Sequence, residues 1–359
     1  MESSDHLCSD VIFEILTRTS FETLSRCKLV CKSWNRVTYD SSFMNLFCRR
    51  TSTISGFFIQ SMASNKYSSN FVSSHESSLP GLNVSLDFLP HNVKIEACSK
   101  QGILCCLSRR DRHFRYYVCK PSTRQLQSLP NPKMRYNTEK VAMVVLRSNP
   151  LRYKIFRLSS PRHLSTTKYY NYGCEIFDSD TWSWKQLQDI LLPYGVIFTT
   201  NPTIFVCGTI HWLASNNNVL AFNEEQETYT TFPLPKPLCD DKLYTYKQLM
   251  EYQGRLALCC NTPEWSLELW VMEDYTDHVW KKRQVLSVES LKRVEPYSSP
   301  TLAAFCNADT ALMMSFKKVI FYKMQEGNFK VIRMTDLNDP CEVFAFQSDL
   351  KPTDLRCGG

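Results

Sequence analysis

The sequence predicts a small all-α unit at the N-terminus followed by an all-β, propeller-like domain, with six blades favoured over seven. Apolar residues follow helical spacing up to about residue 48, and from about residue 93 a pattern of strand-like segments recurs five times. The repeat length of roughly 45–55 residues is typical of propeller blades of about four strands each. We therefore divide the chain into residues 5–48 and residues 51–350.

The N-terminal unit is predicted to contain three to four short helices. Val11 and Ile15 lie four residues apart, which gives the first helix an apolar face, and the polar segment 17–20 ends that helix. The remaining helices are centred on apolar clusters, which comprise Phe21 with Leu24, Val30 with Trp34 and Val37, and Phe43 with Leu46 and Phe47.

The apolar residues of this unit are too numerous for its size. A unit of ~40 residues has too little interior to bury them all in one another. An apolar patch that a small unit cannot hide marks an interface. The excess side chains therefore bind another protein or pack on the domain that follows, and the pattern alone favours neither.

The N-terminal unit resembles an F-box, whose plant form runs roughly LPxDLxxEILxRLPxxSLxRxxxVCKxW. The matching segments are LCSDVIFEILTR (7–18), TLSR (23–26) and VCKSW (30–34). The resemblance implies docking on the Skp-type linker subunit of cullin-RING ubiquitin ligases. By the same resemblance, the linker-facing residues are Leu7, Cys8, Val11, Ile15, Leu16, Leu24, Val30, Cys31 and Trp34. Leu16 and Leu24 are the two that can instead belong to the core of the F-box itself.

Two positions depart from the F-box motif. Cys8 stands where the family usually has proline, and Thr19 and Ser20 replace a leucine–proline pair. Proline fixes φ and orders a loop in advance. We expect that its loss can weaken linker docking without changing the fold.

The C-terminal domain is built from five similar units, which begin near residues 102, 141, 208, 254 and 310. One propeller blade cannot bury both of its faces, so neighbouring blades stack into a ring. The strand-like segment 341–347 follows the fifth unit, and we expect it to pair with strands in 51–90 and complete a sixth blade. An irregular pair of β-sandwiches is the alternative.

Three segments of this domain resemble the F-box-associated (FBA-type, kelch-like) interaction domain of plant F-box proteins. They are EIFDSDTWSW (175–184), GTIHWLA (208–214) and VFAFQSDL (343–350). The resemblance implies a propeller that holds a target protein.

The composition is typical of an ordered intracellular protein. Hydrophobic residues make up 43% of the chain, and a net charge of +7 over 359 residues does not predict nucleic-acid binding. The 16 cysteines are scattered or adjacent within apolar runs and form no CxxC pair, which disfavours disulfide frameworks and zinc sites. With no signal peptide and no apolar run of ~18 residues, we expect no membrane association and a reducing location in the nucleus, the cytoplasm or both.

No catalytic motif is evident. The chain lacks GxSxG, Walker A, GxGxxG and HExxH sequences, and the paired carboxylates lie in turn-like segments where acidic residues are common. His211 lies in a strand that reads as buried, which favours a core histidine. We therefore expect no catalytic residue, no metal and no cofactor.

Loops at one end of the propeller are the predicted target-binding elements. The candidates lie near residues 109–115, 160–172 and 239–246. The first loop is basic and is also typical of a solvated hairpin turn. The individual candidates are Arg109, Arg110, Arg112, Arg115 and Trp265, the last of which follows a proline in a predicted loop.

The sequence thus predicts a substrate-recognition adaptor of an SCF (Skp-cullin-F-box) ubiquitin ligase, which is not itself an enzyme. Its expected partners are a Skp-type linker, a cullin bound through that linker, and an unidentified protein target. Two alternatives stay open. One is an F-box protein that acts outside a ligase, and the other is a propeller lectin or enzyme whose N-terminal helices only cap the ring.

Overall fold

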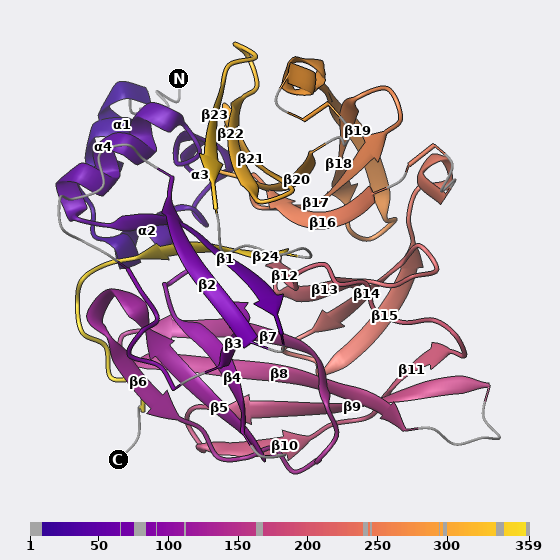
Figure 1. The fold of residues 1–359 in the computed structure, drawn as a ribbon. Helices are drawn as coiled ribbons and strands as arrows, with labels where there is room; N and C mark the ends of the chain where they lie inside the picture. The colour runs from indigo at the N-terminus through magenta and orange to yellow at the C-terminus, as the bar shows by residue number, and fades with distance from the viewer. Residues whose placement is uncertain are drawn as a thin grey trace, which may run out of the picture.

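The computed structural model describes residues 9–64, 66–74, 84–90, 92–110, 113–162, 168–239, 243–244, 246–293, 295–296, 300–334 and 341–356. In this part of the chain, a cluster of helices precedes a ring of β-sheets (Figure 1). None of the described helices is long and apolar enough to cross a membrane.

The N-terminal helical domain contains four described helices, α1 (Ser9–Leu16), α2 (Phe21–Cys27), α3 (Lys32–Val37) and α4 (Ser41–Thr51). Asp40 caps α4, since its carboxylate accepts hydrogen bonds from the backbone N–H groups of Ser42 (2.8 Å) and Phe43 (3.1 Å). The helices bury a small apolar core made of Leu16, Phe21, Leu24, Phe43, Met44 and Phe47.

Six sheets follow, and each forms one blade. Blade 1 contains β1 (Ile54–Ala63), β2 (Lys66–Ser73) and the last strand of the chain, β24 (Cys341–Ser348). Blade 2 contains β3 (Val93–Cys98), β4 (Leu104–Arg110), β5 (His113–Lys120) and β6 (Gln125–Ser128). Blade 3 contains β7 (Thr138–Ser148), β8 (Leu151–Arg162), β9 (Tyr169–Asp178), β10 (Ser183–Gln186) and β11 (Ile190–Pro193).

The other three blades have four strands each. Blade 4 contains β12 (Ile204–Val206), β13 (Thr209–Leu213), β14 (Asn218–Asn223) and β15 (Thr228–Pro233). Blade 5 contains β16 (Tyr246–Tyr252), β17 (Arg255–Thr262), β18 (Ser266–Asp274) and β19 (Val279–Ser287). Blade 6 contains β20 (Thr301–Phe305), β21 (Thr310–Ser315), β22 (Lys318–Lys323) and β23 (Phe329–Arg333).

The blades form a closed ring, which confirms the six-bladed propeller. Their innermost strands contact one another in the order β24, β3, β7, β12, β16, β20 and back to β24. Apolar residues fill each of the six interfaces between neighbouring blades. The core is therefore distributed around the ring, as expected when each blade covers the face of the next.

β24 closes the ring, as the unassigned strand 341–347 predicted. It pairs antiparallel with β1 from Ile54↔Ser348 to Ser61↔Cys341. The Phe346 ring on β24 lies 5.1 Å from the Phe58 ring on β1 in an edge-to-face arrangement. Figure 1 shows the yellow C-terminal strand beside the indigo N-terminal one. The first blade is thus made from both ends of the β domain.

A buried ion pair within blade 3 is hydrogen-bonded to blade 2. Arg157 on β8 donates to Glu175 on β9 at 2.6 Å, and both side chains are almost completely buried. The Arg157 guanidinium also donates to the hydroxyl of Tyr116 on β5 at 2.8 Å. The charge is therefore satisfied by both blades at once, as a buried charge must be.

The ring has two distinct mouths, because the innermost strands all run in the same sense. At the near mouth, where these strands end, Lys100 after β3 pairs with Glu251 of β16 across the ring at 2.8 Å. Gly102 lies against β24 there, since a Cβ on it would come within 2.3 Å of the Ser348 Cβ. At the far mouth, where the strands begin, residues of β3, β7 and β24 line one hollow.

Removing the Phe346 ring should destabilise the whole propeller. Phe346 is 1% exposed in the closing blade, so Phe346→Ala would leave a cavity that costs about 3–5 kcal/mol of unfolding free energy. Urea unfolding followed by tryptophan fluorescence measures this. Phe316→Ala is the matched control because Phe316 is 62% exposed, and equal midpoints for the two variants would contradict the role of β24.

Candidate functional site

The helical domain exposes apolar side chains at two places. Val11 and Ile15 project from α1 into solvent, and Leu29 and Val30 lie in the turn between α2 and α3. The latter two are 86% and 64% exposed, respectively. Aliphatic side chains of this size are usually buried, so these positions are candidates for contact with another protein.

The predicted linker-facing residues fall into three groups in the structure. Val11, Ile15, Val30 and Cys31 are exposed. Leu16 and Leu24 are each 1% exposed and form part of the helical core, so the core alternative holds for both. Trp34 is half-buried and packs against that core, and Leu7 and Cys8 lie outside the described residues.

Leu29 was missed as a candidate. It precedes the VCKSW segment and has no place in the motif, so its exposure could not be inferred from the resemblance. The sequence feature that could have predicted its exposure is its position between two predicted helices. A leucine in a short turn has few neighbouring side chains to pack against.

The helical domain packs on the near mouth of the propeller. The Tyr39 hydroxyl donates to the Glu251 carboxylate at 3.1 Å, and the Tyr39 carbonyl accepts from the Ala308 N–H at 2.9 Å. Gly254 has φ +75° and lies so close to α3 that an added Cβ would be 2.7 Å from the Asn35 side-chain nitrogen. The helices therefore contact turns of blades 5 and 6, away from the far mouth.

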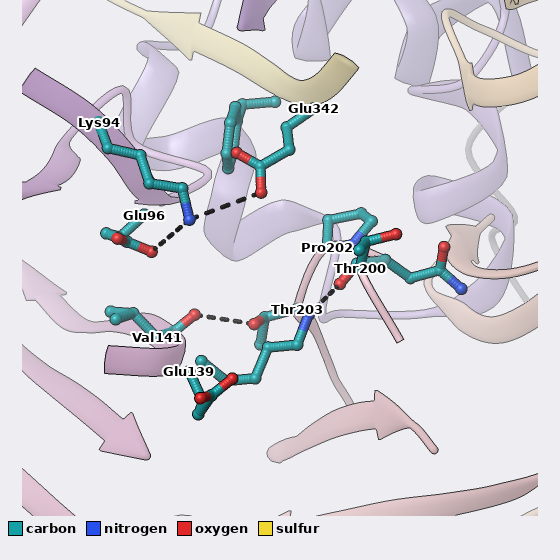
Figure 2. Close-up of a pocket in the computed structure, with 11 residues that line it drawn as sticks. Lys94, Glu96, Glu139, Val141, Thr200, Pro202, Thr203 and Glu342 are labelled. Carbon is teal, nitrogen blue, oxygen red and sulfur yellow. Dashed lines mark hydrogen bonds and ion pairs between the residues drawn. The ribbon is translucent and has the colours of Figure 1, made fainter. Parts of the chain in front are cut away.

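The far mouth holds a hollow lined by charged side chains from three strands of the ring (Figure 2). Lys94 and Glu96 come from β3, Lys140 from β7 and Glu342 from β24. The segment 200–203, which leads into β12, forms another wall. The hollow contains about 330 Å³ of space, counting the part that is open to solvent.

The two ammonium groups of the hollow are both engaged. The Lys94 ammonium lies between two carboxylates, 3.1 Å from Glu96 and 3.6 Å from Glu342 (Figure 2). The Lys140 ammonium donates to the backbone carbonyl of Asn201 at 2.7 Å. Both positive charges thus already have partners within the protein.

Comparison with known protein families assigns both domains. Residues 4–46 match the F-box domain, and residues 44–351 match the F-box associated beta propeller domain. The chain belongs to the F-box proteins that carry this propeller. F-box protein At5g49610 of Arabidopsis thaliana is 26% identical over 96% of both chains. F-box protein At5g41720 of the same plant is 36% identical over 42% of this chain and 84% of its own length.

One departure from the F-box motif has a structural substitute. Ser20, which stands where the family usually has proline, is the N-cap of α2. Its hydroxyl accepts a hydrogen bond from the Thr23 N–H at 3.1 Å. The cap satisfies a backbone donor that would otherwise need water, so α2 has a defined start without the proline.

The described parts of the three predicted target loops of this F-box protein belong to the far side of the propeller. The second strand of each blade runs from the near mouth to the far one, so the paired ends of β4 and β5 at Arg110 and His113 and the β17–β18 turn at Trp265 lie there. The end of β8 and the starts of β9 and β16 lie there as well, whereas residues 111–112, 163–167, 240–242 and 245 lie outside the described part of the chain.

The individual target-binding candidates differ in accessibility. Arg115 is exposed. Trp265 is half-buried against the core between blades 5 and 6, and the Lys292 ammonium lies 5.5 Å from its ring centre. Arg109 and Arg110 are part of β4, and Arg112 lies outside the described residues.

An exposed apolar group also lies on the far side and was not predicted. Tyr169 begins β9, and Leu191 belongs to β11, which pairs with β9 at this end of blade 3. Tyr194 and Ile197 follow in the segment that leads to the far-mouth hollow, and they are 61% and 55% exposed. The far side therefore offers both apolar and charged contacts.

Burial shifts two pKa values in the hollow in opposite directions. It raises the pKa of Glu96 to about 7, because the nearby Lys94 charge does not fully replace the lost water. It lowers the pKa of Lys140 to about 8. Among the described residues, no group of three histidine, cysteine or acidic side chains is arranged to hold a metal ion.

The Glu96 carboxyl should make stability depend on pH. Its pKa is about 7 when folded and about 4.5 when free, so between these values the folded state retains a proton that the unfolded state has lost. The contribution of Glu96 to stability therefore falls as pH rises through this window. The urea midpoint of Glu96→Gln should fall less than that of the wild type between pH 5 and pH 7.

Glu225→Gln is the control for this comparison, because Glu225 is exposed at the opposite side of the propeller. Its pH profile should match that of the wild type. A Glu96→Gln profile parallel to the wild type would show that Glu96 does not titrate in this range.

Proposed function

We propose that this protein is the substrate-recognition adaptor of an SCF ubiquitin ligase. The F-box binds a Skp-type linker and, through it, a cullin, while the propeller holds a target protein. The adaptor contributes proximity between the target and the ubiquitin-conjugating machinery and performs no chemistry itself.

The exposed apolar turn at Leu29 and Val30 carries this proposal. Fully burying one such side chain in an interface stabilises the complex by roughly 1.5–3 kcal/mol. The isolated chain lacks this stabilisation. Ile15 and Val11 on α1 offer additional apolar area of the same kind. A protein that keeps such residues in solvent on an F-box is best explained by a partner that covers them.

The placement of the F-box supports simultaneous binding of linker and target. The helical domain contacts the near mouth through Tyr39 and Asn35, whereas the far-mouth hollow and the described ends of the predicted target loops belong to the other side of the ring. A linker on the F-box would therefore leave the far side free for a target.

Replacing the exposed apolar residues with charge should abolish linker binding. Leu29→Asp and Val30→Asp each place a carboxylate where an apolar contact is expected, and each should cost about 2–4 kcal/mol of binding free energy. Both side chains are exposed, so the fold should be unaffected. Titration calorimetry with a purified plant Skp-type linker measures the loss.

Phe316→Asp is the matched control, since Phe316 is an exposed apolar residue in the turn between β21 and β22 on the far side of the propeller. It should bind the linker as the wild type does. These variants are sharper than Trp34→Ala, because Trp34 also packs against the F-box core. A folded wild-type protein that does not bind the linker would refute the adaptor proposal.

Assembly with the cullin distinguishes an adaptor from an F-box protein that acts outside a ligase. Size-exclusion chromatography of the chain with the linker and a cullin N-terminal domain should give one complex of the three. A stable pair with the linker that excludes the cullin would support the alternative.

A further inference from the structure

The far-mouth hollow contains polar contacts between blades, since Lys94 of blade 2 pairs with Glu342 of blade 1 and Lys140 of blade 3 donates to Asn201 before blade 4. Its charged residues lie where β3, β7 and β24 begin, in the centre of the ring, whereas the blade interfaces are filled by apolar clusters. Glu96 is 6% exposed there and Lys94 is 25% exposed. Groups of this kind are expensive to remove from water, so their gathering at one mouth requires an explanation beyond folding.

The hollow has more acceptor than donor capacity to offer. It contains three carboxylates, Glu96, Glu139 and Glu342, against the two ammonium groups of Lys94 and Lys140. Both ammonium groups already have partners within the protein. Above the Glu96 pKa of about 7, the lining therefore carries a formal charge of −1 (two positive, three negative) in a chain whose net charge is +7.

Two of the carboxylates have unused capacity. Glu139 is exposed, and its described hydrogen bond is from the neutral Ser160 hydroxyl at 2.5 Å. Glu342 is 35% exposed, accepts from the Gln60 amide at 2.6 Å and lies 3.6 Å from Lys94. A carboxylate has about four acceptor positions, so both can accept further hydrogen bonds from a ligand.

The size of the hollow restricts the ligand. Its 330 Å³ counts space that is open to solvent, and the volume comparable with other protein cavities is about 30 Å³, which admits about two water-sized groups. It suits the charged end of one side chain rather than a whole ligand or a folded surface. The neighbouring loops and the exposed Tyr194 and Ile197 would contact the chain on either side of that side chain.

We propose that the far-mouth hollow binds a lysine or arginine side chain of the target protein, paired with Glu139 and Glu342. This inference rests on the proposed role of the propeller in target binding. The cationic head replaces part of its hydration with charge-assisted hydrogen bonds to the two carboxylates. The hollow thereby selects a target segment with a basic residue at one position.

A peptide selection tests the proposal without knowledge of the target. A random peptide library displayed on phage is selected on the immobilised full-length chain. The enriched peptides should share a lysine or arginine. One enriched peptide is then synthesised with that residue, and again with norleucine for lysine or citrulline for arginine, which remove the charge and keep most of the shape.

Binding of both peptides is measured by fluorescence polarisation to the wild type and to Glu139→Gln and Glu342→Gln. Each variant should bind the basic peptide about tenfold more weakly, as for loss of one charge-assisted hydrogen bond. The variants should bind the neutral peptide as the wild type does, because removing the charge of the peptide and removing the charge of the carboxylate abolish the same interaction. Glu225→Gln, on the opposite side, should bind both peptides as the wild type does.

Three results would overturn the proposal. The first is selection of peptides that share an acidic residue, which would assign the hollow to an anion at Lys140. The second is selection of peptides with no shared residue. The third is equal binding of the basic peptide by the wild type and the glutamine variants. Linker binding is measured on the same preparations. Failure there with intact peptide selection would refute the adaptor role and leave the basic-residue site in place.

Discussion

The pairing of β24 with β1 is the contact on which the rest of the molecule depends. It joins the last strand of the chain to the first strand of the propeller over eight residue pairs. A ring of blades that stayed open would expose two apolar blade faces and two strand edges. Closure also brings Glu342 next to Lys94, so the far-mouth hollow exists only in the closed ring. The β24–β1 pairing thus accounts for both the stability of the ring and the candidate binding site.

Closure also fixes where the F-box lies. Helix α4 ends at Thr51 and β1 begins at Ile54, so two residues separate the F-box from the closing blade. A second attachment comes from Tyr39 and Asn35, which contact turns of blades 5 and 6. Two attachments at different points of the ring restrict rotation of the F-box against the propeller. A rigid connection of this kind would hold a target at a constant distance from the linker.

The sequence predicted the parts of the fold that repeat and missed those that depend on distant residues. Strand alternation and the repeat length are local signals, so the blades and the closing strand could be predicted. Helical periodicity shows that Ile15 and Leu16 lie on different faces of α1, but not which face is covered. No local pattern in the sequence predicts that Arg157 and Glu175 are buried together. The hollow was unpredictable because Lys94, Lys140 and Glu342 are brought together only by ring closure.

The cost of the charged hollow is the strongest reason to connect it with function. Replacing a buried ion pair with apolar residues of similar volume is often neutral or stabilising, so such pairs are weak evidence for a structural role. Burial raises the pKa of Glu96 to about 7 and lowers that of Lys140 to about 8, because the loss of water outweighs the nearby charges at both groups. Apolar residues of similar volume in place of the Lys94–Glu96 pair would therefore cost little. The contacts between blades alone do not explain why charged groups gather at the far mouth, and a role in binding does.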